Sequence, residues 1–346
     1  MNTAPLVEKP LLSALQGQAQ WPRPTWFMRQ AGRYLPEYRA LRAEAGGFLD
    51  LCDNPDFATE VTLQPIERYD FEGSILFSDI LTIPRALGQD LAFAAGEGPV
   101  LGELPALDGM RDRLEQGQAA HVLDPAYRAV SLIRAALPAK TTLLGFAGAP
   151  WTLATYMIEG GASKSYADTK AMAYGDPAGF GALMDLLVES VARHLIAQID
   201  AGADGVMIFD SWAGSLDQAA QIRWSAAPIK AIIQRIRQSH TKTPIIVFPR
   251  KAMFAARDLS GFDPFVTLQV DYSNDLPAAA KLDFTAVQGN LDPGRLLASE
   301  SAVHSATKDV LAQVDRDQNH IFNLGHGILK ESNPDAVHWV LDAIRS

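Results

Sequence analysis

Short apolar runs alternate with longer segments of helical periodicity over most of the chain beyond residue 140. The run at 141–148, TTLLGFAG, ends in glycine and is typical of a buried strand. The segment 183–199 carries leucines and a valine three or four residues apart, which indicates an amphipathic helix, and Gly202 is a suitable stop. This alternation predicts an α/β fold with a parallel sheet.

Further elements follow from the same patterns. Strong strand candidates lie at 74–78, 141–148, 205–209, 244–248, 265–270, 284–289 and 320–325, and a weak one lies at 26–30. Besides 183–199, helices are expected behind Pro228, at 276–282, 293–300 and 301–314, and after Asn333-Pro334-Asp335. The irregular segment 90–101 has the pattern of a hairpin.

Periodicity alone fits both a doubly wound sheet and a closed barrel. Polar or unusual residues directly after the strands favour the barrel, because in a (β/α)8 barrel the carboxyl ends of the strands converge on the face that carries the chemistry. These residues are Asp79, Ala149, Pro150, Asp210, Ser211, Arg250, Asp271, Asn290, Asp292 and His326. The alternative, that loops are polar in any case, covers some of them but explains Asp79 within ILFSDIL less well. We therefore expect a single, somewhat distorted (β/α)8 TIM barrel in one domain, 1–346.

Composition narrows the classes of function. The chain has 346 residues, of which 48% are hydrophobic and 20% charged, as in ordinary globular proteins. We find no apolar run of about 18 residues and no signal-peptide pattern at the start of the sequence. The lone cysteine, Cys52, excludes an internal disulfide and a multi-cysteine zinc site. We therefore expect a cytoplasmic protein.

The net charge of −10 argues against a general nucleic-acid binder, which would present a basic surface. An acidic protein can still bind anions where its arginines gather, as they do in MRQAGRYLPEYRALR at 28–42. If this segment is helical, Arg29 and Arg33 share one face, and the planar fork of arginine suits carboxylate capture. The alternative is a solvated basic helix paired with Glu37 and Glu44, and charge alone leaves the two interpretations even.

Asp79 stands in the apolar run ILFSDILTIP, where a carboxylate is costly unless it is paired or hydrogen-bonded. It can accept hydrogen bonds from ligand N–H groups or stabilise a developing positive charge. The alternative is a structural aspartate that caps a helix. Position alone slightly favours a functional role.

Three further segments carry candidate ligand contacts. In GFAGAPWTLATYMIEGGASK, Tyr156 can present its hydroxyl to a site, although a lone tyrosine is more often core, and the glycine pair lacks P-loop spacing. In FDSWAG, Ser211 suits a hydrogen bond to a carboxylate, since neither a Ser–His–acid order nor a nucleophile elbow is legible. In NLGHGI, His326 lies between glycines after a strand, with even odds of ligand contact. The other histidines show no metal-ligand spacing.

Together these segments resemble the uroporphyrinogen decarboxylase family of haem biosynthesis. The matching stretches PTWFMRQAGRYLPEYR, ILFSDIL, GFAGAPWTLATYMIEGG, IFDSWAG, VQGNLDP and NLGHGI occur in family order between residues 24 and 328. The resemblance implies a (β/α)8 barrel, usually a homodimer, that removes CO2 from the four acetate side chains of uroporphyrinogen III to give coproporphyrinogen III. It implies no cofactor and no metal, and a small-molecule tetrapyrrole as partner, with no nucleic acid or membrane.

The resemblance also implies roles for individual residues. Asp79 and Arg29 would be catalytic, with Asp79 holding the pyrrole N–H groups, and Arg42 resembles a further family arginine. Substrate contacts would come from Arg29, Gln30, Ala31, Gly32, Arg33, Asp79, Tyr156, Ser211 and His326. The sequence departs from the family where Lys251 replaces a common glycine, Tyr272 a tryptophan and Lys330 a proline.

Two rival functions differ from this expectation. A corrinoid-linked methyltransferase on the same barrel would use a zinc ion with His and Cys ligands, and Cys52, the only cysteine, is expected off the active face. A non-catalytic tetrapyrrole carrier could share the arginines but would not need Asp79.

Overall fold

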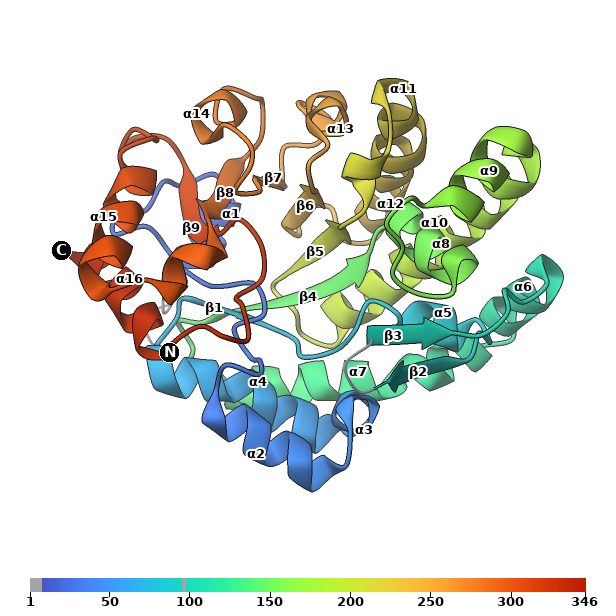
Figure 1. Ribbon diagram of the computed structural model, residues 1–346, viewed down its shortest axis with the longest axis horizontal. Coiled ribbons are helices and arrows are strands. Elements are labelled where there is room, and N and C mark those ends of the chain that lie inside the picture. The colour runs from blue at the N-terminus through green and yellow to red at the C-terminus, as the bar shows by residue number, and fades with distance from the viewer. Residues whose placement is uncertain (1–7, 95–97) are drawn as a thin grey trace, which may run out of the picture.

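The computed structural model describes residues 8–94 and 98–346. Seven parallel strands form one curved sheet with helices around it (Figure 1). In sheet order the strands are β1 Gly73–Ile75, β4 Thr142–Gly148, β5 Gly205–Asp210, β6 Ile245–Pro249, β7 Val266–Gln269, β8 Ala286–Leu291 and β9 His320–Leu324. The α/β class and the seven strong strand predictions are thereby confirmed.

Helices connect the strands on the outside of the sheet (Figure 1). The α-helices are α1 Pro10–Leu15, α2 Pro36–Ala45, α3 Phe48–Asp53, α4 Pro55–Tyr69, α5 Thr82–Ala86, α6 Leu107–Glu115, α7 Gln118–Ala136, α8 Pro150–Glu159, α9 Ala167–Gly175, α10 Pro177–Asp200, α11 Gln218–Ala220, α12 Ala227–Arg237, α13 Met253–Leu259, α14 Leu276–Ala279, α15 Glu300–Leu311 and α16 Asp335–Arg345. The long helices expected from the sequence are confirmed as α10, α12, α15 and α16.

Two predicted helices differ from the structure, and the predicted hairpin agrees with it. The helix expected at 276–282 is only the short α14, and 293–300 forms a 3-10 helix at Pro293–Leu297. The reason is local, because the Asp292 side chain accepts the Gly294 N–H (2.9 Å) and tightens the turn before α15 begins. The hairpin at 90–101 is confirmed as β2 Leu91–Ala94 and β3 Gly98–Leu101, which pair antiparallel, and its turn at 95–97 lies outside the described residues.

The eighth position of the barrel is occupied by the segment 24–28. Thr25 forms a single parallel bridge with Phe322 of β9. On its other side, the Glu72 N–H, just before β1, donates to the Thr25 carbonyl (3.2 Å). The two edge strands of the sheet are therefore joined through this segment, which gives the distorted barrel expected from the sequence.

In the arginine-rich segment the weak strand prediction at 26–30 is wrong, and the condition that residues 29–33 be helical is not met. Residues 26–30 do not form a strand, and residues 29–33 are not helical. Arg29 has a φ of 62°, in the left-handed region, which an extended strand does not allow. The chain turns here, with the Gln30 N–H donating to the Phe27 carbonyl (3.0 Å), and α2 begins only after the turn. The helix face that Arg29 and Arg33 were expected to share is therefore absent.

The interior of the barrel is filled with apolar side chains and closed at its amino end by α1. Buried interior residues from the strands are Leu144, Met207, Ile246, Phe248, Ala286 and Ile321. Leu11 and Leu15 of α1 belong to the same cluster. Gly73 permits this contact, because a Cβ at that position would lie 2.4 Å from the Leu11 side chain. The interior is thus a packed core, which leaves the carboxyl end for a binding site.

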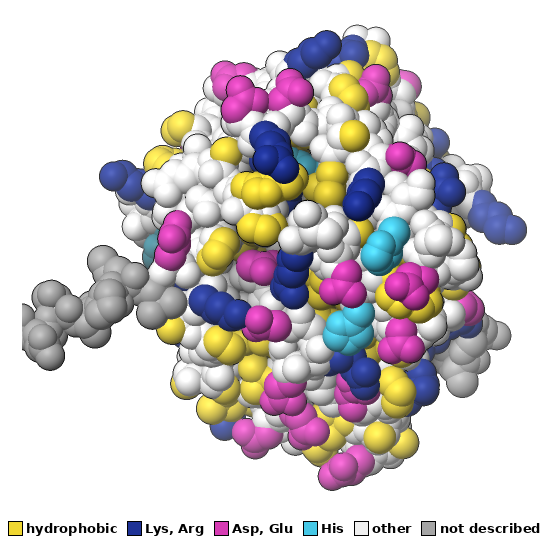
Figure 2. All heavy atoms as spheres, turned by 90° about the vertical axis from the view of Figure 1, so that its left-hand side faces the viewer, with side chains coloured by type: hydrophobic (Ala, Val, Ile, Leu, Met, Phe, Trp, Pro, Cys, Tyr) yellow, Lys and Arg dark blue, Asp and Glu magenta, His cyan; other side chains and the backbone are white. Residues whose placement is uncertain are grey.

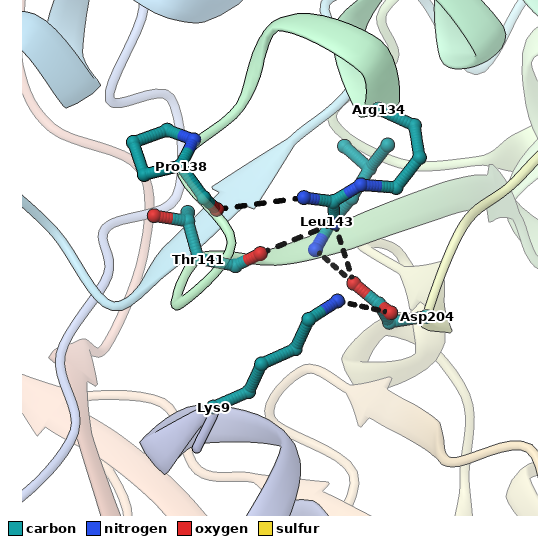
Figure 3. Close-up of polar contacts among 6 residues, drawn as sticks. All are labelled: Lys9, Arg134, Pro138, Thr141, Leu143 and Asp204. Atoms are coloured by element: carbon teal, nitrogen blue, oxygen red, sulfur yellow. Dashed lines mark hydrogen bonds and ion pairs between the residues drawn. The ribbon is translucent and has the colours of Figure 1, made fainter. Parts of the chain in front are cut away.

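Asp204, just before β5, ties three parts of the amino end together (Figure 3). Its carboxylate accepts hydrogen bonds from Lys9 Nζ (2.6 Å), Arg134 Nη1 (3.0 Å) and the Leu143 N–H (2.8 Å). Arg134 also donates to the Thr141 carbonyl (3.2 Å). One carboxylate thereby joins the residue before α1, the helix α7 and the strand β4.

We expect Asp204→Asn to lower the free energy of unfolding by about 2 kcal/mol, because charge-assisted hydrogen bonds from two cations lose their acceptor charge. The shift of the urea midpoint measures this loss. Asp70→Asn is the matched control, since its pair with Lys140 (2.7 Å) is largely exposed, and such pairs contribute about 0.2–1 kcal/mol. Equal midpoints for the two variants would contradict the structural role of Asp204.

The face that carries α15 and α16 mixes acidic, basic and hydrophobic side chains (Figure 2). On that face Lys and Arg are interspersed with Asp and Glu, in keeping with the acidic net charge. Within the described part of the chain, no helix is both long enough and apolar enough to span a bilayer.

Candidate active site

The carboxyl ends of the strands bring the predicted site residues to one end of the barrel. Because the strands run parallel, the residues that follow them lie at the same edge of the sheet. Asp79 follows β1, Ser211 follows β5 and His326 follows β9, while Tyr156 lies on α8, directly after β4. Their roles in binding and catalysis stay predictions, and the geometry of each bears on them.

Asp79 has one oxygen engaged and one available. Its Oδ1 accepts the Leu81 N–H (2.8 Å), and its carbonyl accepts the Thr82 hydroxyl (2.8 Å), so the residue forms the turn that leads into α5. No hydrogen bond or ion pair from the described residues reaches Oδ2. Burial raises the pKa of Asp79, while the Leu81 N–H and the charge of Arg29 oppose that rise. Asp79 thus forms a turn before α5 but does not cap that helix, and its second oxygen has no partner among the described residues.

Arg29 enters the site across a loop of glycines. The Ile328 N–H donates to the Met28 carbonyl (2.9 Å), which fixes the loop after β9 against the turn before Gln30. A Cβ on Gly327 would lie 2.4 Å from Arg29 Cδ, so only glycine leaves room for the arginine side chain. Arg29 is exposed and makes no ion pair within residues 8–94 and 98–346. Its guanidinium is therefore free for a ligand anion.

His326 and Tyr156 complete the group around Asp79 and Arg29. Burial, then the charges of Arg250 and Arg29, lowers the pKa of His326 to about 3. Burial and the negative charge of Asp79 raise the pKa of Tyr156 to about 12. At neutral pH the imidazole is therefore uncharged and the phenol keeps its proton.

The residues next to Arg29 differ in orientation. Gln30 is buried, with Oε1 accepting the Phe27 N–H (3.2 Å) and Nε2 donating to the Gly73 carbonyl (3.3 Å), so its side chain holds the turn against β1. Ala31 and Gly32 are half-buried and follow in the same turn. The main chain of Gln30 is engaged as well, since its N–H donates to the Phe27 carbonyl (3.0 Å) and its carbonyl accepts the Tyr34 hydroxyl (2.8 Å).

Arg33, the second arginine of the segment, is exposed in the turn before α2. Burial raises the pKa of Tyr38 on α2, and the charges of Arg42 and Arg33 oppose that rise, which places both arginines beside this tyrosine. Arg42 also lies 5.7 Å from the ring centroid of Phe48. The charge of Arg29 acts on Asp79, while the substrate-binding role expected for Arg33 stays a prediction. Ser211 is half-buried at the end of β5.

Comparisons with known proteins agree with this arrangement. The sequence model of the family described as uroporphyrinogen decarboxylase (URO-D) matches residues 7–346. A protein from Sphingopyxis alaskensis named uroporphyrinogen decarboxylase is 47% identical over 340 residues, covering 97% of this chain and 98% of its own. One of the same name from Jannaschia sp. is 46% identical, covering 98% and 99%. The chain belongs to the uroporphyrinogen decarboxylase family.

Solved structures support the fold of this family member. A methyltransferase from Methanosarcina mazei superimposes with a TM-score of 0.78 at 16% identity, over 98% of each chain. A putative vitamin-B12-independent methionine synthase from Listeria monocytogenes reaches 0.54 at 12% identity, over 95% of this chain and 96% of its own. At these identities the likeness concerns the barrel architecture alone.

A corrinoid-linked methyltransferase would need a set of zinc ligands, and the described residues of this family member bear on that alternative. Among the described residues, no group of three or more His, Cys, Asp or Glu side chains is arranged to hold a metal ion. Burial, and secondly the charge of Asp79, raises the pKa of the Cys52 thiol. Cys52 is buried within α3.

An aromatic layer that was not expected from the sequence lies at the carboxyl ends of β4, β5 and β6. Phe146 on β4 and Phe209 on β5 are only half-buried, whereas the strand residues before them are fully buried. Their rings lie 5.7 Å apart at 87°, and Phe209 also contacts Phe248 (6.3 Å). This layer forms an apolar floor below the polar residues. Its signal in the sequence was alternation, since these phenylalanines occupy inward-facing positions close to the strand ends.

Asp210 has a structural role in the family member. It is fully buried, and its carboxylate accepts the hydroxyls of Thr152 (2.6 Å) and Ser225 (2.5 Å). The Thr152 hydroxyl in turn accepts the Trp212 N–H (3.2 Å). Burial raises the pKa of Asp210 to about 6, against the hydrogen bonds. The residue anchors the loop of Ser211 and Trp212 through Thr152.

The three departures from the family pattern all lie at exposed positions. Lys251 has a φ of 57°, so it keeps the left-handed backbone that the family's glycine adopts readily. Its N–H donates to Asp271 (2.8 Å). Tyr272 is 39% exposed and lies against Gly325, and Lys330 is exposed beside Glu331 (3.5 Å).

Proposed function

We propose that this chain decarboxylates the four acetate side chains of uroporphyrinogen III to methyl groups, giving coproporphyrinogen III without a cofactor. The observation that carries the proposal is Asp79, a carboxylate with one oxygen held by Leu81 and one oxygen open, beside an unpaired Arg29. Relatives named for this reaction, 46–47% identical over nearly the whole chain, support it.

The chemistry requires an electron sink, which the pyrrole ring itself can supply. Protonation of a ring carbon gives an iminium-like cation. The bond between the acetate CH2 and its carboxylate then breaks, CO2 leaves, and the bonding electrons neutralise the cation. A proton adds to the new exocyclic carbon and the ring carbon loses the first proton, so each acetate consumes one proton and yields one methyl group.

Asp79 and Arg29 are suited to stabilise opposite charges on the substrate, Asp79 a positive charge and Arg29 a negative one. A fixed carboxylate stabilises the positive charge that develops near the pyrrole nitrogens, and its open oxygen can accept their N–H groups. An unpaired guanidinium binds a carboxylate through two parallel hydrogen bonds, which fixes the ring above Asp79. The half-buried rings of Phe146 and Phe209 offer an apolar surface to the macrocycle.

Tyr156 is better suited than His326 to keep a proton for the reaction. The pKa of Tyr156, raised to about 12 by burial and Asp79, leaves the phenol protonated. The pKa of His326, lowered to about 3 by burial, Arg250 and Arg29, leaves the imidazole neutral. His326 can therefore share a hydrogen bond with a substrate carboxylate but does not act as an imidazolium acid.

Anaerobic incubation of the purified protein with uroporphyrinogen III tests the proposal. After oxidation of the products, chromatography should show porphyrins with progressively fewer carboxylates, ending with the tetracarboxylate. The rate should be unchanged after treatment with a chelator. A tetrapyrrole carrier would return only the octacarboxylate, and that result would refute the decarboxylase assignment.

We further propose that the protein works in the cytoplasm as a homodimer. The lone cysteine is buried, which suits a reducing compartment. The molar mass in solution, measured by light scattering, tests the dimer, since a monomer would show the single-chain mass of 37.5 kDa.

A further inference from the structure

Arg250 occupies a fixed position at the same end of the barrel as Asp79. It directly follows β6, and its N–H donates to the Asp210 carbonyl at the end of β5 (3.2 Å). It lies two residues beyond Phe248, whose ring belongs to the barrel interior. Arg250 therefore lies in the turn at the carboxyl end of β6, the end of the barrel at which Asp79 follows β1.

The guanidinium of Arg250 has no partner among residues 8–94 and 98–346. It takes part in no hydrogen bond or ion pair there, and its Nε is buried without an acceptor. Other half-buried arginines are paired, as Arg237 is with Asp263 (2.7 Å). Asp271, the acidic residue after the neighbouring strand β7, is already engaged by Lys251 and Ser273. An unpartnered buried donor is costly, so the free protein holds a cation that lacks its anion.

The charge of Arg250 acts on the same imidazole as the charge of Arg29. The charges of Arg250 and Arg29 both contribute to lowering the pKa of His326, after burial, so the two guanidiniums lie near the same imidazole. The His326 ring lies 6.5 Å from that of Phe248, two residues before Arg250. Strands β7 and β8 separate β6 from β9 in the sheet, so these contacts cross the open end of the barrel.

We propose that Arg250 is a substrate-binding residue that holds a side-chain carboxylate of the tetrapyrrole on the β6 side of the site. The inference rests on the proposed function, because the substrate carries eight carboxylates arranged around a ring. A second guanidinium, after β6, would bind another carboxylate. This contact would fix the orientation of the ring and favour a tetrapyrrole that carries many carboxylates.

Arg250→Gln and Arg250→Lys test the inference, with Arg257→Gln as control. Arg257 lies on the next helix, α13, is exposed, and carries the same charge. Binding is measured with uroporphyrin, the oxidised and unreactive octacarboxylate, by fluorescence titration. Steady-state rates with uroporphyrinogen III and the melting temperature complete the comparison.

We expect Arg250→Gln to raise the Kd for uroporphyrin and the KM about tenfold, as for loss of one charge-assisted hydrogen bond, with kcat within about threefold. Arg250→Lys keeps the charge but not the fork, and should raise Kd about threefold. Arg257→Gln should leave Kd unchanged. The melting temperature of Arg250→Gln should be equal to or above wild type, because an unpartnered cation is removed.

A Kd for Arg250→Gln within twofold of wild type would overturn the inference. So would an equal loss in Arg257→Gln, which would mean a general effect of charge. If Arg250→Gln did not fold, a Kd for Arg250→Lys equal to wild type would overturn it. Absence of turnover by the wild type would refute the proposed function instead, while uroporphyrin binding would still decide on Arg250.

Discussion

Asp79→Asn should lower kcat by about 100- to 1,000-fold, the magnitude seen when one preorganised electrostatic group is removed. The amide keeps an oxygen that can accept the Leu81 N–H, so the turn into α5 should persist. What disappears is the negative charge beside the pyrrole nitrogens. We therefore expect the loss in kcat, with a smaller change in KM, in assays with uroporphyrinogen III.

The pH dependence sharpens this test. Because burial raises the pKa of Asp79, kcat/KM in the wild type should fall as the pH is lowered through that raised value, where the carboxylate gains a proton. The residual activity of Asp79→Asn should lack this acid limb. Asp108→Asn is the control, since that side chain is 94% exposed on α6 and should behave as wild type. A kcat for Asp79→Asn within tenfold of wild type would remove Asp79 from the mechanism.

The strands could be predicted from sequence because they are buried on both faces. Runs such as 205–209 and 245–249 are continuously apolar, which a parallel sheet requires and a surface segment does not tolerate. The strand prediction for 26–30 failed because hydrogen bonding to the loop after β9, and not local propensity, sets the backbone conformation of this segment. The Met28 carbonyl accepts a hydrogen bond from the Ile328 N–H, and Arg29 adopts a left-handed φ. Neither feature is visible in the local sequence pattern.

Some features of the candidate site could likewise be predicted from the sequence, and others could not. Asp79 could be found because a carboxylate inside an apolar run conflicts with its neighbours. Alternation along β4 and β5 places Phe146 and Phe209 on the inward side of the strands. It does not reveal the aromatic layer, because an apolar residue near a strand end looks the same whether it closes a core or faces a ligand. Arg250 was noted only for its place after a strand, since the absence of an acidic partner depends on residues far away in sequence.

Gly327→Ala should lower kcat/KM about 100-fold, because misplacement of a binding group by about 1 Å has effects of that order. The added Cβ would lie 2.4 Å from Arg29 Cδ and 2.7 Å from Cγ, so the arginine side chain must move. Gly181→Ala on α10 is the matched control, since a Cβ there meets nothing within 4 Å.

A double-mutant cycle tests whether the loss passes through Arg29. Arg29→Ala removes the side chain that the new methyl group would strike, so Gly327→Ala should add little to it. The kcat/KM of the double variant should therefore lie within about threefold of Arg29→Ala, far from the product of two independent losses. If the losses multiply, Gly327 acts on the loop of His326 without Arg29, and the glycine is then needed for the loop itself and not to make room for the arginine.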